Sequence, residues 1–223
     1  MQSKVKLSKR QIKEDKFTTF MLTSKDQLAE NWQYWIVAAA VVILLIAAIA
    51  FWVSSSKAKE EQSKVSLAQA MLDYGKGDNQ VAILAFTNIV DEYGGTSAGA
   101  EATYMLGKLY LDERNYEEAG RFFQMYVKKY DDPTNGAAAH AGLATIAENQ
   151  GDFAQAAAEY ELAVAVAPDG PLAAPLGASA VRTHLAAGNV EAARAILEDL
   201  KDKYPNDGTT LQAERIFAEK AGQ

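Results

Sequence analysis

The sequence predicts an all-α protein in which one N-terminal transmembrane helix is followed by an α-solenoid of about four helix pairs and a capping helix. Three observations lead to this prediction. An 18-residue apolar run from Ile36 to Val53 is long enough to cross a membrane. After it, small residues and turn signals recur with a fixed period of 37 residues. The last segment, 209–221, has apolar residues at helical spacing, as expected for the helix that closes such an array.

The apolar run has the features of a membrane helix. Residues 31–56 carry no charge, and at ~1.5 Å per residue an 18-residue helix covers about 27 Å of the roughly 30 Å hydrocarbon core. Aromatic side chains stand at both ends, as in interfacial belts: Trp32, Tyr34, Trp35, Phe51 and Trp52. The alternative, a cleaved signal peptide, has an apolar region of about 7–15 residues before a small-residue cleavage site. Because bulky residues close this run, we expect a retained span at 32–55.

Charge is distributed unevenly along the chain. Residues 1–30 carry seven Lys and Arg against four Asp and Glu, although the whole chain has a net charge of -7. Such a basic tail, at 1–31, favours the cytoplasmic side. We therefore expect a bacterial inner-membrane protein whose following domain is periplasmic. The tail is either a helix on the anionic inner leaflet or a solvated segment.

The repeats are defined by aligned columns of residues. The most regular column contains alanines 37 residues apart: Ala82, Ala119, Ala156 and Ala193. Four residues later, on the same helical face, lie larger apolar residues: Phe86, Phe123, Tyr160 and Leu197. Five residues before each alanine lie the turn positions: Gly77, Arg114, Gly151 and Gly188. Asp or Asn follows each of them, which predicts a helix C-cap and the N-cap of the next helix. Each unit is therefore expected to be a helix–turn–helix with a small-residue seam.

These columns resemble the tetratricopeptide repeat. The segments Tyr104-Met105-Leu106-Gly107 and Asn115-Tyr116-Glu117-Glu118-Ala119, followed by Phe123, carry the resemblance, which covers residues 64–221. The family's usual unit is ~34 residues, so about three extra residues are expected between units. The resemblance implies a tetratricopeptide-like repeat domain at 64–223, joined to the span by a linker at 56–63.

The resemblance also implies a concave groove lined by the first helix of each unit, which would bind other proteins. The residues that would face it, some of which can instead be packing residues, are Met71, Tyr74, Tyr104, Lys108, Leu111, Thr145, Glu148 and Arg182. One anchor and one repeat domain also resemble the plan of the ancillary subunits of the bacterial SecYEG translocon. We therefore expect an accessory protein that meets membrane-complex subunits or exported chains, and that contacts lipid through 32–55.

Reactive constellations are not evident in the sequence. There is no cysteine, Gly95–Gly99 matches a nucleophile elbow without the strand it requires, and His140 and His184 lack the neighbouring ligands of a metal site. We expect no catalytic residue, no metal, no cofactor and no small-molecule substrate. Scattered acidic residues argue against nucleic acid as a partner. Two alternatives stay open: a self-assembling envelope scaffold, and a cell-envelope enzyme that uses Ser97 or His140.

Overall fold

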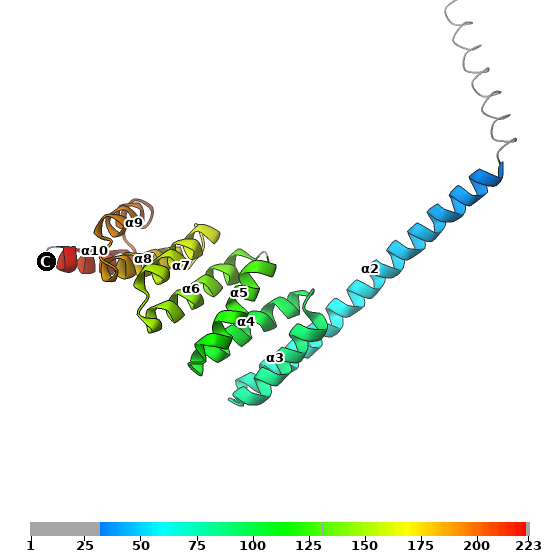
Figure 1. The fold of residues 1–223 in the computed structure, drawn as a ribbon, viewed down its shortest axis with the longest axis horizontal. Helices are drawn as coiled ribbons and strands as arrows, with labels where there is room; N and C mark the ends of the chain where they lie inside the picture. The colour runs from blue at the N-terminus through cyan, green and yellow to red at the C-terminus, as the bar shows by residue number, and fades with distance from the viewer. Residues whose placement is uncertain (1–31, 131, 222–223) are drawn as a thin grey trace, which may run out of the picture. The chain divides into compact units, whose positions relative to one another are not determined.

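The fold is helical throughout the part of the chain that the computed structural model describes, residues 32–130 and 132–221. These residues form nine helices and no strand (Figure 1). The predicted all-α class is therefore confirmed. The basic tail at 1–31 lies outside the described residues. The chain divides into two units, Met1–Lys57 and Ala58–Gln223.

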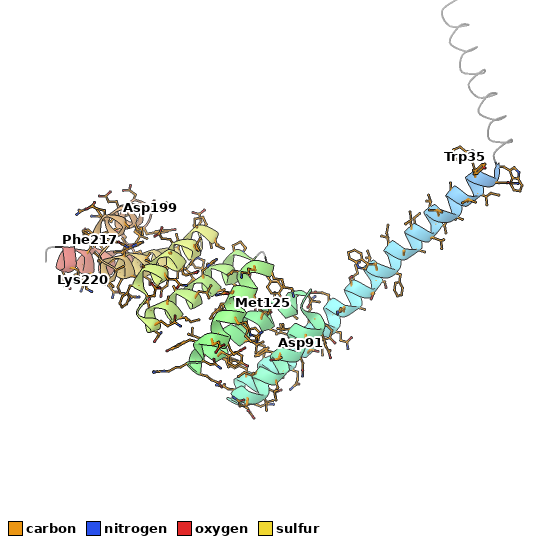
Figure 2. The ribbon with its side chains drawn as sticks, viewed as in Figure 1. Trp35, Asp91, Met125, Asp199, Phe217 and Lys220 are labelled. Atoms are coloured by element: carbon orange, nitrogen blue, oxygen red, sulfur yellow. The ribbon has the colours of Figure 1, made fainter. Side chains whose placement is uncertain are left out.

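Helix α2 (Trp32–Gly75) supplies the described part of the first unit. The apolar side chains of its residues 32–53 are exposed, and Figure 2 shows side chains projecting from this part of the helix, with Trp35 near its start. Among the described residues, α2 is the one helix long and apolar enough to cross a membrane, by length and composition. A helix near the N-terminus that meets these criteria can also be a signal sequence.

The segment 56–63, predicted as the linker, is helical. Helix α2 runs through these residues without a break and ends at Gly75. The physical reason is that the stretch contains neither Gly nor Pro, while Lys59, Glu60 and Glu61 favour helix. A helix that has been nucleated extends through such residues at little cost.

The second unit contains four helix pairs and a last helix, as predicted. The C-terminal part of α2 packs with the first of the following helices: α3 (Asn79–Tyr93), α4 (Ser97–Asp112), α5 (Tyr116–Lys129), α6 (Pro133–Gln150), α7 (Phe153–Val166), α8 (Ala173–Ala186), α9 (Val190–Lys203) and α10 (Gly208–Ala221). From α3 onward, consecutive helices contact one another, and α10 packs against both α8 and α9 (Figure 1). Contact between neighbouring pairs makes this unit an α-solenoid.

The turns inside the pairs have the predicted chemistry. Gly77, Gly151 and Gly188 adopt left-handed backbone conformations with φ of 82°, 80° and 81°. Arg114, at the corresponding place in the second pair, has φ 59°. The Asp or Asn that follows accepts a hydrogen bond from the new helix in the first three pairs: Asp78 from Val81 N, Asn115 from Glu118 N and Asp152 from Gln155 N.

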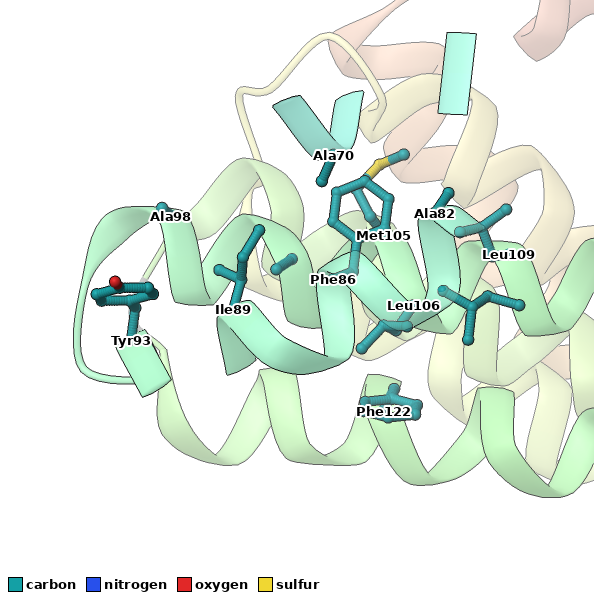
Figure 3. Packing of buried hydrophobic residues seen from close by; sticks show 12 residues of the cluster. Ala70, Ala82, Phe86, Ile89, Tyr93, Ala98, Met105, Leu106, Leu109 and Phe122 are labelled. Atoms are coloured by element: carbon teal, nitrogen blue, oxygen red, sulfur yellow. The ribbon is translucent and has the colours of Figure 1, made fainter. Parts of the chain in front are cut away.

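The seam between paired helices is closed by small residues. All four alanines of the regular column are fully buried. The packing they allow is visible in the first cluster, where Phe86 lies among Ala70, Ala82 and Met105 (Figure 3). In the next pair, Phe123 fills the space left by Gly107 and Gly142, since a Cβ on either glycine would overlap its ring. Close approach of the backbones is therefore built into these positions.

Candidate protein-binding groove

The eight residues predicted to face a groove fall into three columns on α2, α4, α6 and α8. One column contains Met71, Lys108, Thr145 and Arg182, a second contains Tyr74, Leu111 and Glu148, and Tyr104 stands alone in the third. Residues one period apart occupy equivalent positions of stacked helices. The eight residues therefore lie on one side of the array, here called the groove face. Their role in binding stays a prediction.

The first two helices of the groove face present side chains that are free to contact a partner. Met71 is 39% exposed, and Lys108 is also exposed. Tyr74 and Leu111 are half-buried, each packed against a neighbouring hydrophobic cluster. Apolar, aromatic and cationic groups are thus mixed on this part of the face, as they are in protein interfaces.

Tyr104 is mainly a packing residue. Its ring lies 6.1 Å from that of Phe123 and 6.0 Å from that of Tyr126, measured between centroids. These distances and the tilted geometries are those of stabilising aromatic pairs. Truncation of Tyr104 would consequently disturb the packing of α4 against α5 in the second pair, which the sequence alone does not reveal.

Glu148 and Arg182 are bound to each other across two repeats. The Arg182 guanidinium donates to both carboxylate oxygens of Glu148, at 2.7 and 2.9 Å. The hydroxyl of Tyr160 donates to the same carboxylate at 2.8 Å. This arrangement joins α6, α7 and α8, and a bidentate pair of this kind is geometrically specific. Glu148 and Arg182, which both lie on the groove face, are therefore also structural residues.

The environment of this pair changes the protonation equilibria. Burial alone would raise the pKa of Glu148, but the hydrogen bonds from Arg182 and Tyr160 outweigh burial and hold that pKa below its ordinary value. The pKa of Tyr160 is raised, first by burial and then by its bond to Glu148. The carboxylate is thus ionised, and the phenol neutral, throughout the physiological range.

A cleft of about 210 Å³ lies beside Arg182, between α8 and α10. It is lined in addition by Pro175, Ala178, Ser179, Thr209, Gln212, Ala213 and Ile216. The sequence prediction missed these residues. Periodicity alone places Ala178 on the groove face, because it lies two periods after Tyr104. The α10 residues belong to the capping helix, for which the sequence prediction named no groove residue.

The side chains weighed for catalysis have structural partners. Ser97 binds Glu60 through its backbone N–H, at 3.2 Å, and through its hydroxyl. His140 Nδ1 lies 2.8 Å from a carboxylate oxygen of Glu159, and His184 Nε2 lies 2.5 Å from one of Glu161. Both glutamates are on α7, so each histidine links α7 to a neighbouring helix. Neither histidine is hydrogen-bonded to Ser97 in the described residues.

A stack of helix pairs with a small-residue seam and Gly-Asp or Gly-Asn turns defines the class of helical-repeat solenoids. Family comparison is more specific. A family described as "Tetratricopeptide repeat-like domain" matches residues 25–169, and one described as "Tetratricopeptide repeat" matches residues 149–214. The chain belongs to the tetratricopeptide repeat family, whose fold is that of a protein–protein interaction module. Proteins of this family are generally non-enzymatic scaffolds.

Solved structures share the fold at low sequence identity. MamA superposes with a TM-score of 0.58 and 19% identity over 73% of this chain and 84% of that one. A tetratricopeptide repeat protein from Parabacteroides merdae gives 0.61 and 10% over 73% of this chain and 61% of that one. YrrB gives 0.51 and 18% over 69% and 74%. No curated protein sequence matches the chain.

Proposed function

We propose that this protein is a membrane-anchored interaction module that holds a segment of a partner protein against its groove face, as an accessory to a membrane complex or to protein export and envelope assembly. The observation that carries the proposal is the joining of two features in one helix. Helix α2 begins with an apolar stretch of membrane-spanning length and ends inside the first repeat pair.

Retention of the apolar helix is supported by the family match and by the sequence. The matched region starts at residue 25, so it includes the whole apolar run. The apolar run of 18 residues is longer than the apolar region of about 7–15 residues that a signal peptide has. The basic tail favours the cytoplasm, which leaves the repeats on the periplasmic side. This plan resembles that of the ancillary SecYEG translocon subunits.

Recognition of a protein segment is supported by the composition of the groove face. Its exposed members in the first two pairs, Met71 and Lys108, are one apolar and one cationic side chain. The related fold of YrrB is that of "a TPR protein with an unusual peptide-binding site". Anchoring raises the effective concentration of membrane partners toward the millimolar range, so a weak contact suffices.

The test changes the groove face without touching the framework. The variant Met71→Glu/Lys108→Glu replaces one apolar and one cationic side chain, both exposed. The matched control, Leu84→Glu/Lys128→Glu, makes the same chemical changes at exposed positions of α3 and α5. Tagged full-length chains would be purified from membranes in mild detergent, and co-purifying proteins quantified by mass spectrometry.

We expect the amount of co-purifying partner protein to be at least ten-fold lower for the groove-face variant than for the wild-type chain. The control should retain the wild-type amount. Equal thermal unfolding of all three chains would show that folding is unaffected. Retention of every partner by the groove-face variant would refute recognition at this face and point to the tail or the membrane helix.

A further inference from the structure

The outer face of the first helix pair is apolar where the end of a repeat array is ordinarily polar. Val65 is 72% exposed, whereas its counterparts one, two and three periods later are at most 8% exposed: Ala102, Ala139 and Leu176. Leu72 is 61% exposed, and its counterparts are at most 7% exposed: Leu109, Ile146 and Thr183. In the later pairs the preceding repeat covers these positions, through the contacts of α3 with α4, α5 with α6 and α7 with α8.

The shape of this face matches a helix. Val65 and Leu72 are seven residues apart, so they lie on one side of α2 two turns from each other. The small side chains of Ala58 and Ala68 lie on the same side, and both are exposed. We call Ala58, Val65, Ala68 and Leu72 the end stripe. Apolar residues at seven-residue spacing with small residues between them are the contact pattern of two packed helices. Terminal repeats without such a partner need a polar outer face.

We propose that the end stripe is covered by the end stripe of a second copy of this chain, with the two α2 helices packed in parallel. This inference rests on the membrane anchoring proposed above. Two copies inserted in one membrane have the same orientation, so a two-fold axis between them runs along the membrane normal. That axis makes the helices parallel and in register, and each stripe then meets its own equivalent, as an isologous interface requires.

Charges beside the stripe are compatible with this pairing. In a parallel, in-register pair, Lys64 faces Gln69 of the second copy, so no like charges meet at that flank. Glu61 lies on the stripe side and meets its own equivalent across the two-fold axis. Its charge is offset within each copy by Lys64, whose Nζ is 2.9 Å from a Glu61 carboxylate oxygen. Co-localisation in the membrane also raises the effective concentration of the two copies, so a short stripe is sufficient for association.

Disulfide cross-linking tests the proposal directly, because the natural sequence has no cysteine. Val65→Cys and Leu72→Cys would be introduced singly into the full-length chain. The control is Lys64→Cys, which is exposed and only one residue along α2, but rotated by about 100° around the helix. A disulfide needs Cβ atoms within about 3.5–4.5 Å, which residues at the centre of a parallel helix pair can reach.

We expect mild oxidation of intact membranes to give at least five-fold more dimer, on non-reducing gels, for Val65→Cys and Leu72→Cys than for Lys64→Cys. In detergent, Val65→Asp/Leu72→Asp should halve the mass of the wild-type particle while leaving its helical circular dichroism unchanged, since both side chains are exposed in the single chain. Cross-linking no stronger than that of Lys64→Cys, or an adduct with a different protein, would overturn the proposal.

The same membranes separate this inference from the proposed function. A chain that resists carbonate extraction, keeps its partners and yet forms no cross-link refutes only the second copy on the end stripe. A chain that is extracted from the membrane refutes the anchoring on which both proposals rest.

Discussion

Arg114 occupies a backbone conformation that the other three repeats give to glycine. Its φ is 59°, beside 82°, 80° and 81° for the glycines of the equivalent turns. A left-handed conformation costs a residue with a Cβ roughly 1–2 kcal/mol. Glycine avoids this cost, but it destabilises the folded state by about 0.4–1 kcal/mol because it increases the conformational entropy of the unfolded chain. We therefore expect Arg114→Gly to raise the free energy of unfolding by about 0.5–1 kcal/mol, measured by denaturant titration in detergent.

Gly151→Ala is the matched reverse change. A Cβ at Gly151 meets no atom within 4 Å, so only the backbone conformation is affected. We expect a loss of about 1 kcal/mol. Equal stabilities for both variants and the wild type would show that the left-handed turn carries no conformational cost in this array.

Gly142 is required by packing rather than by its backbone. A Cβ there would overlap the ring of Phe123, which is buried in the second cluster. Overpacking of this kind typically costs ~1–3 kcal/mol, so Gly142→Ala should lower the stability by about that amount. The control is Gly120→Ala, where the nearest atom to a new Cβ is Ile146 Cδ1 at 3.8 Å. Because alanine favours helix, this control should stabilise the protein by up to about 1 kcal/mol. A neutral Gly142→Ala would contradict the tight seam.

At the scale of elements, the bond between Glu148 and Arg182 joins α6 to α8 and makes stability depend on acid pH. The folded-state pKa of Glu148 is lowered from 4.5, so the unfolded chain binds its proton more readily. The stabilisation is then present above the unfolded pKa and is lost as pH falls through the folded pKa. We expect the unfolding temperature of the wild type to fall more steeply below pH 4.5 than that of Glu148→Gln/Arg182→Met.

The double variant is preferred because a single change leaves an unpaired, partly buried charge. The Glu148 side chain is only 19% exposed, so Arg182→Ala should destabilise the protein more than replacement of both partners does. If the unfolding temperatures of the wild type and the double variant fell equally steeply below pH 4.5, this ion pair would not contribute to the stability of the folded state.

The elements show which parts of the fold are predictable from sequence. The helix pairs, their turns and the buried alanines are predictable from periodicity, since each unit packs against its neighbours in the same way. The helical continuity of 56–63 is not predicted by the repeat period, because it depends on the helices at both ends of this segment. The contacts of Glu148 with Arg182 and of Ser97 with Glu60 each occur once among the described residues, so they cannot be predicted from residues that recur with the repeat period. The same holds for the exposed end stripe, which only a comparison of burial between repeats reveals.

For the whole molecule, the central claim is that an unbroken helix carries a protein-binding repeat domain on the outer side of a membrane. An anchor and a repeat array complement each other physically. An anchor supplies orientation and local concentration, while a repeat array supplies an extended surface. The claim therefore depends on where the second unit lies and on whether α2 stays in the membrane.

The most direct measurement uses Gln124→Cys, an exposed position on α5 of a chain that has no other cysteine. Spheroplasts would be treated with a membrane-impermeant maleimide, and the labelled chain followed through carbonate extraction. The account predicts labelling without lysis and recovery of the labelled chain in the membrane pellet. Labelling only after lysis, or release of the labelled chain into the soluble fraction, would contradict it.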